Sequence, residues 1–132
     1  MNPIILLVED DDVDAMALER AAMIAGCQTS IIRARDGVEA VEILSSRANP
    51  DVKLVITDIN MPRMNGLELL QHMKQTPGLQ TIPVVVLTTS RDDRDRMSAY
   101  KSNVAGYMVK PVDHRQFEEM ARIVFDYWKL SL

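Results

Sequence analysis

The chain has 132 residues, of which 47% are hydrophobic and 26% are charged, with a formal net charge of −4. A chain of this size and composition can fold as one globular domain without a disulfide. The negative charge offers no basic field to nucleic acid, and the apolar run at residues 4–8 is too short for a secretory signal or a membrane span. We therefore expect one cytoplasmic domain over residues 1–132 that binds neither nucleic acid nor a membrane.

Five short apolar runs alternate with segments in which apolar residues recur at helical spacing. The runs lie at residues 4–8, 30–32, 54–56, 84–87 and 107–109. Three of them are continuous rather than alternating, as in strands that are buried on both faces of a parallel sheet. Asp36-Gly37 and Asn65-Gly66 are typical helix starts, and Ser90 with Asp93 three residues later resembles a capping box. The order of strands and helices predicts an α/β domain with a doubly wound parallel sheet.

Acidic residues are concentrated where the first apolar run ends. Residues 9–14 hold five carboxylates, and the helix that follows can use Asp11 or Asp12 as its cap. Capping does not explain Glu9 and Asp10, which still belong to the end of the strand. Carboxylates this close repel one another, and a divalent cation with oxygen ligands is the simplest compensation. Taken alone, the cluster fits either a solvated helix start or a metal site.

Polar residues also follow three further apolar runs: Asp58 after the third, Thr88 after the fourth and Lys110 after the fifth. In doubly wound domains the working groups gather at the carboxyl ends of the strands. If the first and third strands are neighbours, Asp58 faces Glu9 and Asp10 across one crevice. The three carboxylates would then form a Mg²⁺ site, while Thr88 and Lys110 could bind phosphoryl oxygens.

Four segments of the chain resemble the receiver domains of bacterial two-component response regulators. They are residues 7–10 (LVED), 56–66 (ITDINMPRMNG), 83–88 (PVVVLT) and 106–111 (GYMVKP). The resemblance covers nearly the whole chain, and the segments occur in the family's order. It implies a flavodoxin-like domain with five parallel strands in the order 2-1-3-4-5.

The resemblance also implies a function. A sensor histidine kinase would transfer a phosphoryl group to Asp58. Asp10 would bind Mg²⁺ directly, Glu9 largely through water, and Asn60 through its backbone carbonyl. The protein would be a signalling domain rather than an enzyme, since it would catalyse only its own phosphotransfer and dephosphorylation. Glu9 departs from the pattern, because many receivers have Asp at this position.

Thr88 and Tyr107 are expected to carry the signal. On phosphorylation Thr88 would move toward the phosphoryl group and Tyr107 would turn inward. These movements would change the face formed by the fourth helix, the fifth strand and the fifth helix.

The last helix carries more apolar surface than its own sheet can cover. Ile123, Tyr127 and Leu130 form a stripe beside the core-facing one, and Phe125 and Leu132 lie opposite it. We expect this surplus surface to form a homodimer. The tail with Tyr127-Trp128 is similar to that of stand-alone receivers found beside phytochrome-type sensor kinases, which implies such a kinase as the partner.

Two other classes of protein remain as alternatives. In a phosphatase of the haloacid dehalogenase type, Asp10 would be the nucleophile and Asp12 the acid, but the chain is short for that fold and Asp58 would have no role. A flavodoxin-like electron carrier or binding module would need a first loop of Ser, Thr and Gly to hold a phosphate, whereas the acidic loop here would repel one.

Overall fold

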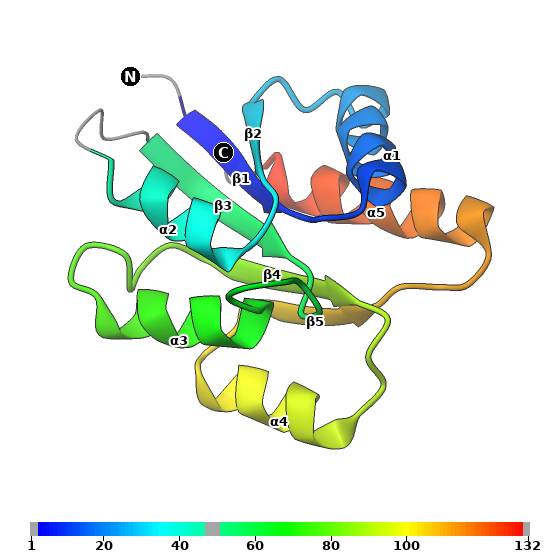
Figure 1. The fold of residues 1–132 in the computed structure, drawn as a ribbon. Coiled ribbons are helices and arrows are strands. Elements are labelled where there is room, and N and C mark those ends of the chain that lie inside the picture. The colour runs from blue at the N-terminus through cyan, green and yellow to red at the C-terminus, as the bar shows by residue number, and fades with distance from the viewer. Residues whose placement is uncertain (1–2, 47–50, 131–132) are drawn as a thin grey trace.

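Five strands and five helices alternate along residues 3–46 and 51–130, which are the residues that the computed structural model describes (Figure 1). The strands are β1 (Pro3–Val8), β2 (Ser30–Ala34), β3 (Asp51–Thr57), β4 (Val84–Thr88) and β5 (Gly106–Val109). The helices are α1 (Asp12–Ile24), α2 (Gly37–Leu44), α3 (Gly66–Gln75), α4 (Asp93–Lys101) and α5 (His114–Trp128). None of these helices has the length and apolar character needed to cross a bilayer.

The strands form one parallel sheet in the order β2-β1-β3-β4-β5, which confirms the predicted topology. Val8 pairs with Thr57 at the end of β1 and β3, and Thr88 pairs with Val109 at the end of β4 and β5. The strands therefore end nearly level with one another. Residues that follow different strands are brought to one edge of the sheet.

Helices cover both faces of the sheet (Figure 1): α1 and α5 lie on one face, and α2, α3 and α4 lie on the other. Successive side chains along a strand point alternately to the two faces of the sheet. Ile5 and Leu7 belong to the apolar cluster beneath α1 and α5, whereas Leu6 and Val8 belong to the cluster beneath the other three helices. Burial on both sides explains why these strands read as continuous apolar runs.

Each helix begins at an Asp or Asn whose side chain accepts a hydrogen bond from a backbone N–H of the first turn. The capping residues are Asp11, Asp36, Asn65, Asp92 and Asp113. The expected start of α4 at Ser90 is wrong. The Ser90 hydroxyl instead donates to Asp95 Oδ2 at 2.6 Å, and the Asp92 carboxylate accepts from the backbone N–H of Arg94 at 2.8 Å.

The expectation that Phe125 adds to the exposed surface of α5 is also wrong, since its side chain is 1% exposed. Phe125 follows Phe117 by eight residues, and eight residues of an α-helix turn through two revolutions plus about 80°. Phe125 therefore lies beside the stripe that contains Phe117 rather than opposite it. That side of α5 packs against α1, where Arg20 forms an ion pair with Glu118 at 3.2 Å. Leu132, expected on the same surface, lies outside the described residues.

The residue that opens α3 must be glycine. A Cβ on Gly66 would lie 1.9 Å from the backbone carbonyl oxygen of Asp58, a contact that only a backbone shift could relieve. We expect Gly66→Ala to lower the free energy of unfolding by about 3 kcal/mol or more. Gly106→Ala is the control, because its Cβ would meet only side-chain atoms at 3.9 Å. Urea unfolding should separate the two variants, and equal stabilities would contradict the close approach at Gly66.

Candidate functional site

The Lys110 ammonium group lies among three carboxylates at the carboxyl edge of the sheet. Its Nζ is 2.7 Å from Glu9 Oε1, 2.9 Å from Asp14 Oδ2 and 3.2 Å from Asp58 Oδ2. The Lys110 and Glu9 side chains are only 4% and 3% exposed, and that of Asp58 is 11% exposed. The structure thus brings together residues that follow β1, β3 and β5, as the sequence predicted.

Backbone hydrogen bonds that continue the sheet beyond its strands fix these residues. The N–H of Asp58 donates to the carbonyl of Val8 at 3.1 Å, and the N–H of Lys110 donates to the carbonyl of Thr88 at 2.7 Å. The N–H of Glu9 donates to Ala34 on the other side of β1 at 3.0 Å. Because each site residue is held by a neighbouring strand, its backbone has the rigidity of the sheet.

Sequence reasoning did not single out Asp14 among the five carboxylates of residues 9–14. Asp14 lies one turn before Leu18, a fully buried residue of α1, and therefore shares the inward face of that helix. Its carboxylate reaches Lys110 from this position. The helical period was the signal in the sequence that could have identified it.

Glu9, Asp10 and Asp58 can each direct one carboxylate oxygen so that all three oxygens lie within 4.8 Å of one another. Only oxygen ligands are offered, and Asp10 is exposed with no hydrogen-bond donor to its carboxylate among the described residues. One ammonium group leaves this edge with surplus negative charge. Both the ligand type and the charge fit a hard divalent cation. Asn60 lies exposed two residues beyond Asp58, on the loop that joins β3 to α3.

Burial and pairing shift the titration of the central ion pair. Burial raises the pKa of the Glu9 carboxyl to about 7, although the hydrogen bond from Lys110 opposes this effect. Burial also disfavours the charged form of Lys110, but hydrogen bonds to Glu9 and Asp14 outweigh it and raise the pKa of Lys110. The lysine therefore stays charged at neutral pH.

Thr88 and Tyr107 are connected through the loop that follows β4. Thr88 is fully buried, and its Oγ1 accepts a hydrogen bond from the N–H of Ser90 at 3.2 Å. The half-buried Tyr107 donates its hydroxyl to the carbonyl of Ser90 at 3.2 Å. The predicted switch residues thus hold the same loop residue from two sides.

Of the residues expected to form a dimer, Ile123 and Tyr127 lie on α5 and Leu130 lies in the turn that follows it. Ile123, Tyr127 and Leu130 are 64%, 65% and 83% exposed. Tyr127 packs edge to face against Trp128, with ring centroids 5.1 Å apart.

Known proteins of similar sequence carry the same type of domain. Residues 5–122 match the response regulator receiver domain family. The chain is 36% identical over 130 residues to the probable methanogenesis regulatory protein FilR2 of Methanothrix harundinacea, covering 95% of this chain and 83% of that protein. It is 32% identical over 133 residues to the response regulator Rcp1 of Synechocystis, covering 96% of this chain and 90% of that protein.

Solved structures agree with the sequence matches. The Mn²⁺-bound form of response regulator Rcp1 superposes with a TM-score of 0.92 at 31% identity, covering 98% of this chain and 96% of that one. The phosphorylated cyanobacterial phytochrome response regulator RcpA superposes with a TM-score of 0.89 at 29% identity, covering 100% of this chain and 97% of that one. The sequence, the topology and the arrangement of acids around a lysine agree, and the chain belongs to the response regulator receiver domain family.

Proposed function

We propose that Asp58 accepts a phosphoryl group from the phosphohistidine of a sensor histidine kinase in a Mg²⁺-dependent reaction. The observation that carries this proposal is the position of the Lys110 ammonium group, 3.2 Å from Asp58 Oδ2 at the point where three carboxylates converge. The proposal treats the protein as a signalling domain that catalyses only its own phosphotransfer and dephosphorylation. Phosphorylation of the similar protein RcpA supports it.

The chemistry requires little beyond positioning and charge neutralisation. The ionised carboxylate of Asp58 attacks phosphorus, the P–N bond to the kinase histidine breaks, and its electron pair remains on the imidazole nitrogen. Asp58 then carries an acyl phosphate. Lys110 is placed to pair with a phosphoryl oxygen, and Thr88 can donate its hydroxyl hydrogen to another.

Three acids and one carbonyl would hold the cation. Asp10 and Asp58 would bind Mg²⁺ directly, Glu9 largely through water, and Asn60 through its backbone carbonyl. When bound, Mg²⁺ would neutralise charge on the phosphoryl oxygens. The Mn²⁺-bound structure of the similar protein Rcp1 supports the binding of a divalent cation.

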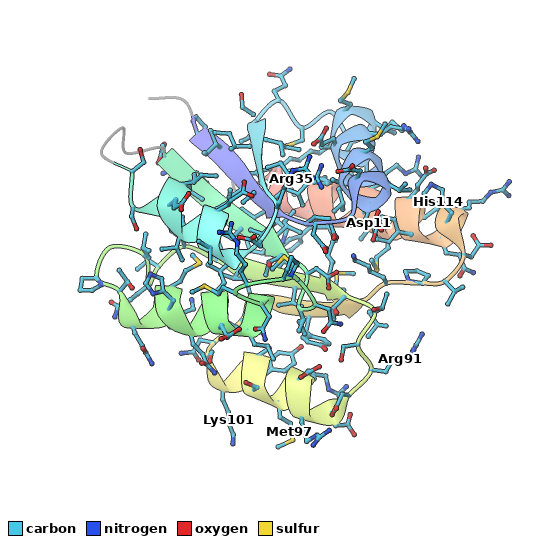
Figure 2. The ribbon with its side chains drawn as sticks, in the orientation of Figure 1. Asp11, Arg35, Arg91, Met97, Lys101 and His114 are labelled. Carbon is cyan, nitrogen blue, oxygen red and sulfur yellow. The ribbon has the colours of Figure 1, made fainter. Side chains whose placement is uncertain are left out.

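The signal would leave the site through the loop after β4. If the Thr88 hydroxyl turns to a phosphoryl oxygen, it gives up the hydrogen bond from the N–H of Ser90. Ser90 then moves, and Tyr107, which is bound to its carbonyl, turns further inward. The surface that changes is formed by α4, β5 and α5, from which Met97 and Lys101 project away from the sheet (Figure 2).

The two alternative functions lack support in the site. As the general acid of a phosphatase, Asp12 would have to be protonated. Hydrogen bonding to Arg33, with a further contribution from Arg35, instead holds the pKa of the Asp12 carboxyl below its usual value. A phosphate-binding loop of the flavodoxin type is also disfavoured, because Glu9 and Asp10 would repel the phosphate.

Resemblance to RcpA, a phytochrome response regulator, favours a phytochrome-type kinase as the partner. We also propose a homodimer through the α4, β5 and α5 surface. The exposed stripe of Ile123, Tyr127 and Leu130 supports it, because contiguous exposed apolar surface marks interfaces. With Phe125 buried, this proposal rests on those three residues.

Acetyl phosphate or beryllofluoride with Mg²⁺ should modify the protein at Asp58 alone. Glu9 and Asp58 both contact Lys110 and belong to the three-carboxylate cluster, but the Asp58 side chain is 11% exposed and that of Glu9 only 3%. Asp58→Asn should abolish labelling and leave the melting temperature within a few degrees of the parent. Mass mapping of the phosphorylated protein decides the site. Phosphate found on Asp10 would favour the phosphatase alternative.

Mg²⁺ affinity should rise about tenfold from about pH 6 to about pH 8, because a protonated Glu9 opposes cation binding until its carboxyl ionises. The direction follows from the Glu9 pKa, which is raised to about 7. Calorimetric titration at several pH values measures the effect. Glu9→Gln should remove most of this pH dependence and Asp10→Asn should abolish binding; a flat profile in the parent would contradict the raised pKa.

Sedimentation at micromolar concentration should show a dimer that the double substitution Tyr127→Ala, Leu130→Ala converts to a monomer. Phosphorylation should change the dimer's affinity by a coupling of about 1–3 kcal/mol. Met23→Ala is the control, since Met23 is 79% exposed on α1, away from the proposed interface. A parent that is monomeric with and without beryllofluoride would exclude the dimer.

A further inference from the structure

The β3–α3 loop, residues 58–65, begins with the proposed acceptor Asp58, contains Asn60 and leads into α3. Its two ends are close together, because the N–H of Gly66 donates to the carbonyl of Ile59 at 2.9 Å. The N–H of Ile59 also donates to Asp58 Oδ1 at 2.6 Å. Asn60 is the residue directly after Ile59, inside the segment closed by the bond from Gly66 to Ile59, and it is exposed. The backbone of the loop therefore needs a second point of attachment if the Asn60 carbonyl is to have a fixed position.

Asp36 and Arg63 supply that attachment. Arg63 Nε donates to Asp36 Oδ2 at 2.8 Å, and its NH2 group donates to Asp36 Oδ1 at 3.2 Å. The Asp36 side chain is 7% exposed and also caps α2, accepting from the N–H of Glu39 at 3.0 Å. The pairing is bidentate and charge-assisted, which is the strong and directional form of an Arg–carboxylate contact.

The neighbouring residues reinforce the same junction. The N–H of Gly37 donates to the carbonyl of Met64 at 2.9 Å, so two adjacent residues at the start of α2 hold two adjacent residues of the loop. The approach is close, since a Cβ on Gly37 would lie 2.6 Å from Met64 atoms. The junction is thus packed as well as hydrogen-bonded.

The backbone of Arg63 has a conformation that side chains disfavour. Its φ of 65° lies in the left-handed region, which residues with a Cβ rarely adopt. Glycine or asparagine would take this position more easily. An unfavourable conformation next to a functional loop persists where surrounding contacts hold it, and the ion pair with Asp36 is the contact that holds this one.

We propose that Asp36 and Arg63 are positioning residues that fix the β3–α3 loop so that the Asn60 carbonyl can serve the cation site beside Asp58. The inference rests on the proposed function, because it assigns these residues a role in the same metal-dependent site. Neither side chain belongs to the acidic cluster itself. They act through the backbone of the loop, as outer-sphere partners orient ligands in other metal sites.

Arg63→Met tests the proposal, since it keeps an unbranched apolar stem and removes the guanidinium. We expect the Mn²⁺ dissociation constant, measured by electron paramagnetic resonance, to rise about tenfold, the lower end of the usual effect of outer-sphere partners. The Mg²⁺ concentration that gives half-maximal labelling by acetyl phosphate should rise in parallel. The rate at saturating Mg²⁺ should stay close to that of the parent, because the acceptor and Lys110 are unchanged.

Three further variants separate positioning from folding. Arg63→Gly relaxes the left-handed backbone and should fold well, yet it should lose cation affinity as Arg63→Met does. Asp36→Asn keeps an acceptor for the helix cap, and combining it with Arg63→Met should weaken binding no further than Arg63→Met alone. Arg94→Met is the matched control, because Arg94 also binds an N-capping aspartate, Asp92, at 2.9 Å, but on α4.

The outcomes separate this inference from the proposed function. If the parent protein neither binds Mn²⁺ nor becomes labelled on Asp58, the proposed function fails. If the parent does both but Arg63→Met and Arg63→Gly bind Mn²⁺ within about twofold of it, only the positioning role is overturned. An equal loss of affinity in Arg94→Met would also overturn it.

Discussion

The contact between the Lys110 ammonium and the carboxylates of Glu9, Asp14 and Asp58 governs the arrangement of the site. Transferring a charge from water to a site this deeply buried costs several kcal/mol unless the charge is paired. The sheet order places β5 three strand positions from β1, at about 4.8 Å per position. The long side chain of Lys110 spans much of that distance and reaches acids that follow β1 and β3. This explains how Glu9, where many receivers have Asp, still serves the site: its extra methylene helps the carboxylate to reach Lys110.

The same contact leaves the sheet edge unbalanced. Lys110 cannot neutralise all of the carboxylates around it, and Asp10 adds another on the solvent side. A fold selected for stability alone would disperse these charges, because like charges in contact weaken the folded state. Their concentration is useful if the missing positive charge arrives with a cation and the phosphoryl group occupies the same crevice. The proposed cation site therefore accounts for the surplus negative charge at this edge.

Strand order and the acids at the strand ends could be predicted from the sequence. In a parallel sheet, the residues that directly follow each strand all lie at the same edge. Asp14 was within reach of the same reasoning, since the helical period places it on the inward face of α1. The pairing of Asp36 with Arg63 was not, because it depends on how α2 and the β3–α3 loop meet in three dimensions. Phe125 failed for a different reason: the helical period itself places it beside the Phe117 stripe, so its burial against α1 was within reach of the sequence.

The two loops that border the site are attached to the rest of the domain by different kinds of contact, and this difference suits the proposed switch. The β3–α3 loop is fixed by a charged, bidentate contact between Arg63 and Asp36. The backbone of the loop after β4 is held at Ser90 by two neutral hydrogen bonds of 3.2 Å, from its N–H to Thr88 and from Tyr107 to its carbonyl, while the Ser90 hydroxyl donates to Asp95 on α4 at 2.6 Å. Neutral bonds of this length contribute less than charge-assisted ones. Rotation of the Thr88 hydroxyl toward a phosphoryl oxygen would therefore break its bond to the Ser90 N–H and disturb the second loop, while the contact of Arg63 with Asp36 stays intact. The cation side of the site can stay rigid while the signalling side moves, because the two functions are assigned to separate loops.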